Sequence, residues 1–214
     1  KNVRLGGGFN IAAMWRPVRL AEDYATADIL TQGRVVFGVG RGYHTREVET
    51  FGVPLLDQPA NRDLFEEQVD IVFKSFEKDS FSHKGENYTI PPEVPYRGYT
   101  LEEITVVPRP VNRPVECWQP IQSATPRGLD FMAKHGMSGI IGGVSSEGGA
   151  MNKAVQGFRD AYSRAGLELQ LGERLSIGFH YHIAETQETA MDEVGAMYEE
   201  NLKMIGHLRL APSL

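Results

Sequence analysis

Short apolar runs alternate with longer segments in which apolar residues return every three or four positions. The short runs are typical of buried strands, and the longer period is typical of helices with one buried face. The pattern predicts strands over residues 3–8, 35–39, 115–122, 138–141 and 175–184. It predicts helices over residues 17–30, 61–76, 126–135, 151–164 and 188–205. Strands that alternate with helices, without long polar linkers, favour a parallel sheet covered by helices.

One segment departs from this alternation. Residues 81–88 suggest a small hairpin that turns near Gly85, and six prolines follow between residues 91 and 114. Prolines at this density exclude regular structure throughout. A long irregular stretch inside a compact domain is usually a lid, an insertion or an active-site loop. We therefore expect a single domain over residues 1–214 with an irregular insertion at about 77–114.

The α/β pattern leaves two architectures open. One is an open doubly wound sheet, and the other is a (β/α)₈ barrel. Five strand–helix units are visible, whereas a complete barrel typically takes ~250 residues. The chain also starts without methionine and enters a strand at once, which we interpret as a missing N-terminal part.

The composition of the chain excludes several classes of function. The formal net charge is −6, so no broad basic surface is expected for nucleic acid. No apolar run approaches the ~18 residues of a membrane span. A single cysteine, Cys117, excludes an internal disulfide framework and a multi-cysteine zinc site. We expect a soluble cytoplasmic protein with neither a nucleic-acid nor a membrane partner.

Glycine-rich turns lie where ligands bind in parallel α/β folds. Residues 38–42 follow a predicted strand but fail the dinucleotide spacing, because Tyr43 takes the place of the last glycine. The turn is either a ligand loop that carries Arg41 or a tight turn with a surface arginine. Residues 6–8 are three glycines, which suit a strained backbone, a flat ligand or a flexible turn.

A second candidate ligand site is formed by residues 123–128, where a predicted strand leads into a predicted helix. Thr125 is a good N-cap and Pro126 suits the first helical position. The free N–H groups of such a helix end accept a phosphate, and Arg41 and Arg62 could complete a phosphate clamp. Ordinary helix capping explains the same residues without a ligand.

Alternation along residues 175–184 separates an apolar face from a small, polar one. His180 and His182 lie on the polar face, near the carboxyl end of the strand. In a barrel this face lines the lumen, so the two histidines are candidates for a ligand pocket. A pair of histidines on a strand can also bind metal, but other ligands are lacking at the remaining strand ends, so no metal site is predicted.

Taken together, these segments resemble the bacterial luciferase family of flavin-dependent monooxygenases. The resemblance is carried by the order and spacing of residues 17–23, 32–34, 37–43, 51–53, 61–62, 85, 122–126 and 135–136. It favours the barrel over the open sheet, because the family fold is a (β/α)₈ barrel with a long insertion. It also implies that this partial chain begins at the third strand and leaves little room for the last.

The resemblance implies a binding site for reduced flavin mononucleotide (FMN). Arg41 and Arg62 match phosphate-binding arginines, and the Gly8–Phe9 bond falls where relatives have a non-proline cis peptide beneath the flavin ring. The implied cofactor-binding residues are Gly8, Phe9, Arg41, Arg62, Ser123, Ala124, Thr125 and Gly128. The candidate substrate-pocket residues are Tyr43, His180 and His182. No catalytic base is assigned, because the family's histidine near the flavin lies in a part that this chain lacks.

The implied activity is oxygenation of a small organic substrate by O₂ through a flavin peroxide. A separate reductase supplies the reduced FMN, and the relatives are usually homodimers. A non-catalytic flavin-binding relative and a metal-dependent barrel hydrolase that uses His180 and His182 remain alternatives. The deazaflavin F420 is a less favoured cofactor, because the pair of arginines suits the mononucleotide.

Overall fold

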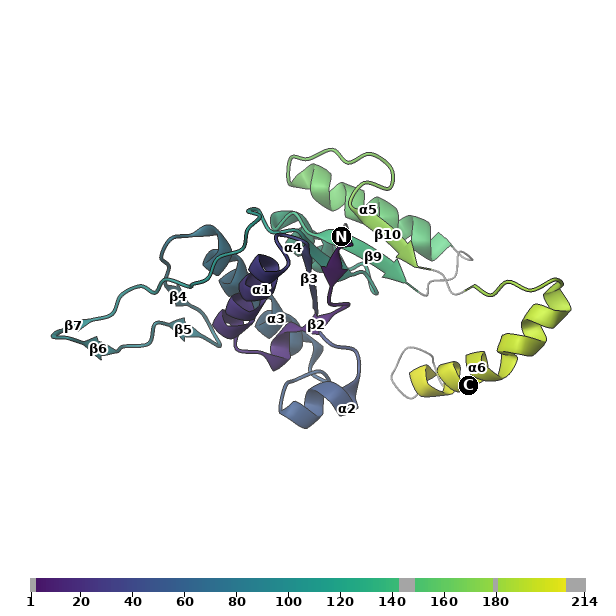
Figure 1. Cartoon of the computed structure of the whole chain (residues 1–214), viewed down its shortest axis with the longest axis horizontal. Coiled ribbons are helices and arrows are strands. Elements are labelled where there is room, and N and C mark those ends of the chain that lie inside the picture. The colour runs from purple at the N-terminus through teal and green to yellow at the C-terminus, as the bar shows by residue number, and fades with distance from the viewer. Residues whose placement is uncertain (1–2, 143–148, 179–180, 207–214) are drawn as a thin grey trace.

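A parallel sheet forms the centre of the molecule (Figure 1). The computed structural model describes residues 3–142, 149–178 and 181–206. In the order in which they pair, the strands are β1 (Leu5–Gly6), β3 (Val35–Gly40), β8 (Cys117–Pro120), β9 (Ser138–Gly142) and β10 (Leu175–Gly178). A further short strand, β2 (Asn10–Ile11), pairs with the far end of β3. Every pairing in this sheet is parallel.

The order of the strands decides between the two architectures. A doubly wound sheet reverses its strand order at a switch point, whereas neighbouring strands of a barrel follow one another along the chain. Here the order along the sheet is the order along the chain, without a reversal. The described sheet is therefore an arc of a (β/α)₈ barrel, as the resemblance implied.

Helices follow the strands. They are α1 (Pro17–Leu30), α2 (Thr45–Val48), α3 (Gln58–Glu77), α4 (Pro126–Lys134), α5 (Ala150–Arg164) and α6 (Gln187–Gly206), with 3₁₀ turns at Ala12–Met14 and Glu49–Phe51. In Figure 1, α6 lies apart from the sheet and from the other helices. Within the described residues, no helix combines the length and apolar character that a bilayer crossing requires.

The main core lies between the sheet and helices α1, α3, α4 and α5. An aromatic cluster joins three of these elements: the ring of Phe76 on α3 lies 5.2 Å from Tyr24 on α1 and 5.7 Å from Phe37 on β3. All three side chains are buried. Large rings dominate the burial of apolar area, so this cluster fixes α3 against the sheet.

Two small hairpins occupy the segment between α3 and β8. They pair β4 (His83–Lys84) with β5 (Thr89–Ile90), and β6 (Pro95–Tyr96) with β7 (Tyr99–Thr100). The first hairpin is the one predicted around Gly85. Glu67 of α3 anchors it by accepting bonds from the backbone N–H groups of Asn87 and Tyr88, both at 2.9 Å. The prediction that residues 77–114 form an insertion in a single domain stays a prediction.

The last predicted strand is shorter than expected. β10 ends at Gly178, where its ladder with β9 also ends at Gly142. Residues 181–184 are irregular, and Tyr181 and Ile183 are 84% and 82% exposed. The prediction of a strand to residue 184 was wrong, because a strand extends only as far as a neighbour pairs with it.

Candidate functional site

A cavity of about 850 Å³ opens where β2, β3, β8 and β9 end. This is the carboxyl edge of the sheet, at which barrel enzymes build their sites. Nine of the residues singled out from the sequence line it: Gly8, Phe9, Arg41, Tyr43, Arg62, Ser123, Ala124, Thr125 and Gly128. The topology therefore brings together segments that lie more than a hundred residues apart in the chain.

One wall of the cavity is built around a cis peptide bond between Gly8 and Phe9. The turn lies so close to β3 that a Cβ on Gly38 would stand 1.9 Å from the carbonyl oxygen of Gly7. Asn10 Nδ2 fastens the turn by donating to the Gly38 carbonyl at 3.1 Å. Only glycine at position 38 permits this approach, which presents Phe9 at the cavity wall.

Arg41 follows β3 directly and is held by amide side chains of α3. Its Nη1 donates to Asn61 Oδ1 at 3.0 Å and to Gln58 Oε1 at 3.4 Å. Asn61 is fully buried, and its Nδ2 donates back to the Arg41 carbonyl at 3.2 Å. Burial lowers the pKa of Arg41, and the positive charge of Arg62 lowers it further. Two positive charges thus share one cavity, which favours an anion as its ligand.

Arg62 reaches from α3 over the first turn of α4. Its Nη1 lies 3.1 Å from the place that a Cβ on Gly128 would occupy, so glycine leaves room for the guanidinium. Thr125 takes the N-cap position with extended backbone, as predicted, but its side chain makes no capping bond. The hydroxyl and the first N–H groups of the helix remain available to a ligand at this end.

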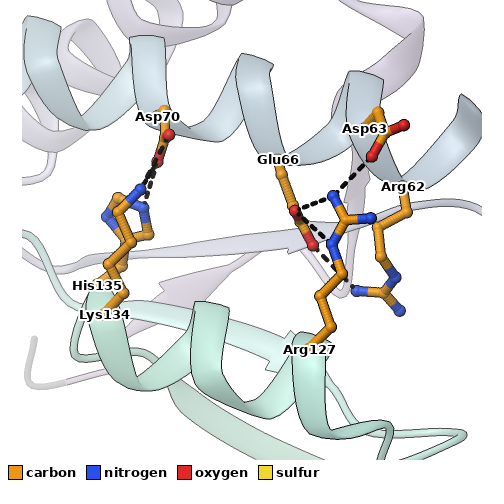
Figure 2. A network of polar contacts seen from close by, with 7 residues as sticks. All are labelled: Arg62, Asp63, Glu66, Asp70, Arg127, Lys134 and His135. Carbon is orange, nitrogen blue, oxygen red and sulfur yellow. Dashed lines mark hydrogen bonds and ion pairs between the residues drawn. The ribbon is translucent and has the colours of Figure 1, made fainter. Parts of the chain in front are cut away.

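Charged residues hold α3 against α4 beside the cavity (Figure 2). Glu66 stands between two arginines: its Oε1 accepts from Arg62 at 3.4 Å, and its Oε2 accepts from Arg127 at 2.6 Å and 3.0 Å. Arg127 also pairs with Asp63 at 2.6 Å. Glu66 therefore links Arg62, a lining residue, to the start of α4.

A second group of charges joins the same helices one to two turns further along (Figure 2). Asp70 Oδ1 lies 2.6 Å from His135 Nε2 and 2.8 Å from Lys134 Nζ. The His135 ring stacks on Phe73, with 4.5 Å between the ring centres. Partial burial alone would raise the pKa of Asp70, but the hydrogen bonds from His135 and Lys134 outweigh it and lower that pKa.

Replacing Asp70 with asparagine should make the protein less sensitive to acid. Because the pKa of Asp70 is lower in the folded chain than in the unfolded one, its stabilising effect is complete above about pH 4. The effect is lost as the pH falls through the folded pKa. We expect the free energy of unfolding in urea to fall more in the wild type than in Asp70→Asn between about pH 5 and about pH 3. Equal losses in both proteins would contradict this role.

Of the two histidines predicted as pocket residues, only His182 lies in the described structure, and it does not line the cavity. His182 is absent from its lining, and its Nε2 contacts Glu193 Oε2 of α6 at 2.6 Å. This follows from the early end of β10, since only a continued strand would carry residue 182 past the cavity. His180 lies outside the described residues. Within the parts of the chain that are described, no three histidine, cysteine or carboxylate side chains form a group that could hold a metal ion.

Sequence reasoning missed several polar residues of the site. Gln58 and Gln119 also line the cavity, and Asn61 supports Arg41 from behind. Gln119 shares a strand face with two apolar neighbours, Cys117 and Ile121, and a glutamine on such a face was an available signal. Gln58 carried no such signal, because it precedes the apolar periodicity of α3, and Asn61 was noted only within the family pattern at residues 61–62.

The arrangement suits a ligand with an anionic end and a flat end. Arg41, Arg62 and the N-terminus of α4 form the anion-binding end of the cavity, and the wall at Phe9 forms the other end. A Cβ at Gly40 would make ordinary van der Waals contacts with Phe9 Cβ at 3.5 Å and Pro120 Cγ at 3.7 Å, so these two residues border the same wall. FMN has a phosphate at one end and a planar ring at the other, so the residues present fit it.

Known proteins that resemble this chain include the oxygenase component of a flavin-dependent monooxygenase and a monooxygenase solved with FMN. The oxygenase component of a flavin-dependent trigonelline monooxygenase from Acinetobacter baylyi is 26% identical over 193 residues, which are 89% of this chain and 48% of that protein. The oxygenating constituent of 3,6-diketocamphane monooxygenase from Pseudomonas putida, solved with FMN, has a TM-score of 0.73 at 17% identity. That match covers 96% of this chain and 57% of the other.

A further solved structure, an F420-dependent secondary alcohol dehydrogenase in complex with an F420–acetone adduct, has a TM-score of 0.69 at 19% identity. It is matched over 91% of this chain and 54% of its own. These structural likenesses show the fold. The chain spans about half the length of the relatives it matches. Residues 1–210 match the luciferase-like monooxygenase family, and the chain belongs to that family.

Proposed function

We propose that this chain forms the cofactor-binding part of an FMN-dependent monooxygenase that oxygenates a small organic substrate with O₂. The proposal rests on one observation: a single cavity joins two half-buried arginines and a helix N-terminus to a wall at Gly8 and Phe9. Reduced FMN, when bound, supplies the two electrons that activate O₂ for transfer of one oxygen atom.

The chain's own residues bind and orient the cofactor. Arg41 and Arg62 donate charge-assisted hydrogen bonds to the phosphate, and Thr125 and the first N–H groups of α4 add neutral donors. The turn at Gly8–Phe9 supports the flat ring. Tyr43, which is 47% exposed at the edge of the cavity, can cover the ring side and restrict water.

The named relatives bear on the reductase and on the choice of cofactor. A flavin-dependent oxygenase component is a relative of this chain, so we propose that a separate reductase delivers the reduced FMN. We also propose a cytoplasmic homodimer. A fold shared with an F420-dependent enzyme makes the deazaflavin the alternative cofactor to test.

Anaerobic titration of the purified protein with reduced FMN should reveal saturable binding, followed by fluorescence or by calorimetry. The two arginines recognise the phosphate in either redox state, but only the reduced cofactor activates O₂. We therefore expect that admitting air to the reduced complex produces a transient absorbance change before oxidised FMN appears. The same titration with oxidised FMN and with the deazaflavin measures the preference for the cofactor.

The possible outcomes of these titrations point to different functions. Binding of oxidised FMN without a transient species would indicate a flavin-binding protein without oxygenase activity. Tighter binding of the deazaflavin than of FMN would move the protein to the other cofactor class. Absence of binding to any of the three would refute the proposal.

A further inference from the structure

Glu66 of α3 is the hydrogen-bond partner of the Arg62 guanidinium at the wall of the cavity. Its Oε1 accepts from Arg62 Nη1 at 3.4 Å, and the described part of the chain offers Arg62 no other acceptor. The Arg62 side chain is 13% exposed and that of Glu66 is 16% exposed, so the pair is largely withdrawn from solvent. A guanidinium has more N–H donors than one carboxylate oxygen can use, so Arg62 keeps donors for a ligand.

Those remaining donors lie at the start of α4. The place that a Cβ on Gly128 would occupy is 3.1 Å from Arg62 Nη1, 3.4 Å from its Nη2 and 3.1 Å from Thr125 Oγ1. The guanidinium therefore stands beside the hydroxyl and the first N–H groups of the helix. The rotamer of Arg62, and not its charge alone, decides whether its donors and those of the helix converge on one anion.

The carboxylate of Glu66 is itself held in place from α4. Its Oε2 accepts from Arg127 Nη2 at 2.6 Å and from Arg127 Nε at 3.0 Å (Figure 2). Arg127 is fixed in turn by an ion pair of 2.6 Å with Asp63. Glu66 thus sets the position of Arg62 relative to the helix end that the arginine faces.

Two effects of Glu66 on a bound phosphate oppose each other. Its negative charge repels the phosphate, but the positive charge of Arg127, at 2.6 Å, offsets most of this repulsion. Its hydrogen bond restricts the rotamers of a long, flexible side chain before the ligand arrives, which reduces the entropy lost on binding. The second effect dominates, because a direct ion pair counteracts the first and nothing counteracts the second.

We propose that Glu66 is a positioning residue that holds the Arg62 guanidinium in the orientation that binds the phosphate of FMN. This inference rests on the proposed function and concerns a residue that acts on the cofactor through another. It also distinguishes Glu66 from Asp63. Both carboxylates lie on α3 and pair with Arg127, but among the ion pairs of the described residues only that of Glu66 includes Arg62.

Glu66→Gln tests this role with almost no change in size. A carboxylate offers one oxygen to each arginine, whereas a carboxamide has one acceptor oxygen and one NH₂ group. The short bonds from Arg127 hold that oxygen, so the NH₂ group faces Arg62, donor against donor. We expect reduced FMN to bind about tenfold more weakly to this variant, while the affinity for reduced riboflavin, which lacks the phosphate, stays unchanged.

The same substitution in an Arg62→Ala background separates positioning from helix packing. Arg41 remains there, so FMN binding should stay measurable. The carboxylate then has no arginine to orient, and only its repulsion of the phosphate is left. Glu66→Gln should therefore leave FMN affinity unchanged or raise it slightly in that background. Asp63→Asn is the matched control and should change FMN affinity less than about twofold, because its carboxylate is 55% exposed.

The inference would be overturned by an equal loss of FMN affinity in both backgrounds or by an equal loss of riboflavin affinity. Either result would mean that Glu66 acts through the packing of α3 on α4 or through the shape of the cavity. An FMN affinity of Glu66→Gln equal to or above that of the wild type would also overturn it, since charge would then decide. A wild type that does not bind FMN would refute the proposed function itself, and the role of Glu66 with it.

Discussion

Replacing Arg41 with alanine should weaken binding of reduced FMN by about 100-fold. The guanidinium is half-buried beside Arg62, and burial and that neighbouring charge lower its pKa. A phosphate between the two arginines relieves their repulsion, so the hydrogen bonds it receives are charge-assisted and form in a partly desolvated site. Anaerobic titration, followed by fluorescence, measures the loss.

Three comparisons separate this role from a general effect of charge. Arg164→Ala removes the same charge from an exposed residue of α5 that pairs with Asp130, and it should leave FMN affinity unchanged. Arg41→Lys keeps the charge without the planar fork, so an intermediate loss is expected. Riboflavin affinity should not respond to Arg41→Ala. An equal loss for riboflavin would mean that Arg41 shapes the cavity and does not bind the phosphate.

Local patterns predicted most helices because their signals lie within the helix itself. α4 runs over Pro126–Lys134 and the prediction was residues 126–135, since both the proline near its start and its apolar face are visible in the sequence. α3 starts at Gln58, three residues before the predicted start. Its first turn precedes the apolar periodicity and is held by Asp57 Oδ1, which accepts from the Ala60 N–H at 3.1 Å. Apolar periodicity does not detect a turn that begins with a cap.

Long-range contacts of buried carboxylates could not be predicted. Asp28, at 1% exposure, accepts a hydrogen bond from the N–H of Val111 at 2.8 Å, across 83 positions of sequence. Glu67 anchors the first hairpin through backbone N–H groups twenty positions away. Neither contact leaves a local pattern, because backbone donors exist at almost every residue and only the fold selects which of them meets the carboxylate.

The residues of the site also divide into those that local sequence patterns predicted and those that they did not. Arg41 and Thr125 lie at strand ends, where ligand-binding residues of parallel folds gather, so position alone made them candidates. Arg62 lies inside a helix; it was a candidate because a second arginine could complete a phosphate clamp with Arg41, and the resemblance to a family implied the same role. His182 was selected by alternation along a strand that ends four residues earlier. Alternation describes the faces of a strand but not its length, which depends on the neighbour.

Replacing Phe76 with alanine should lower the free energy of unfolding by about 4 kcal/mol. Phe76 is 2% exposed in the last turns of α3 and contacts the rings of Tyr24, Phe37 and Phe73, with 5.2 to 6.3 Å between ring centres. Truncation removes the buried ring and leaves a cavity between α1, α3 and the sheet, which cannot close without moving a helix. Urea unfolding monitored by circular dichroism measures the change.

Phe51→Ala is the matched control, because that ring is 68% exposed and should contribute less than about 0.5 kcal/mol. Phe76→Leu keeps most of the volume and should cost well under half of the alanine value. Since α3 also carries Arg62, the alanine variant should bind FMN more weakly at temperatures where it begins to unfold, but with near-normal affinity well below them. A loss for Phe76→Ala no larger than that for Phe51→Ala would mean that the aromatic cluster does not hold α3 to the sheet, and the position of Arg62 would then need another cause.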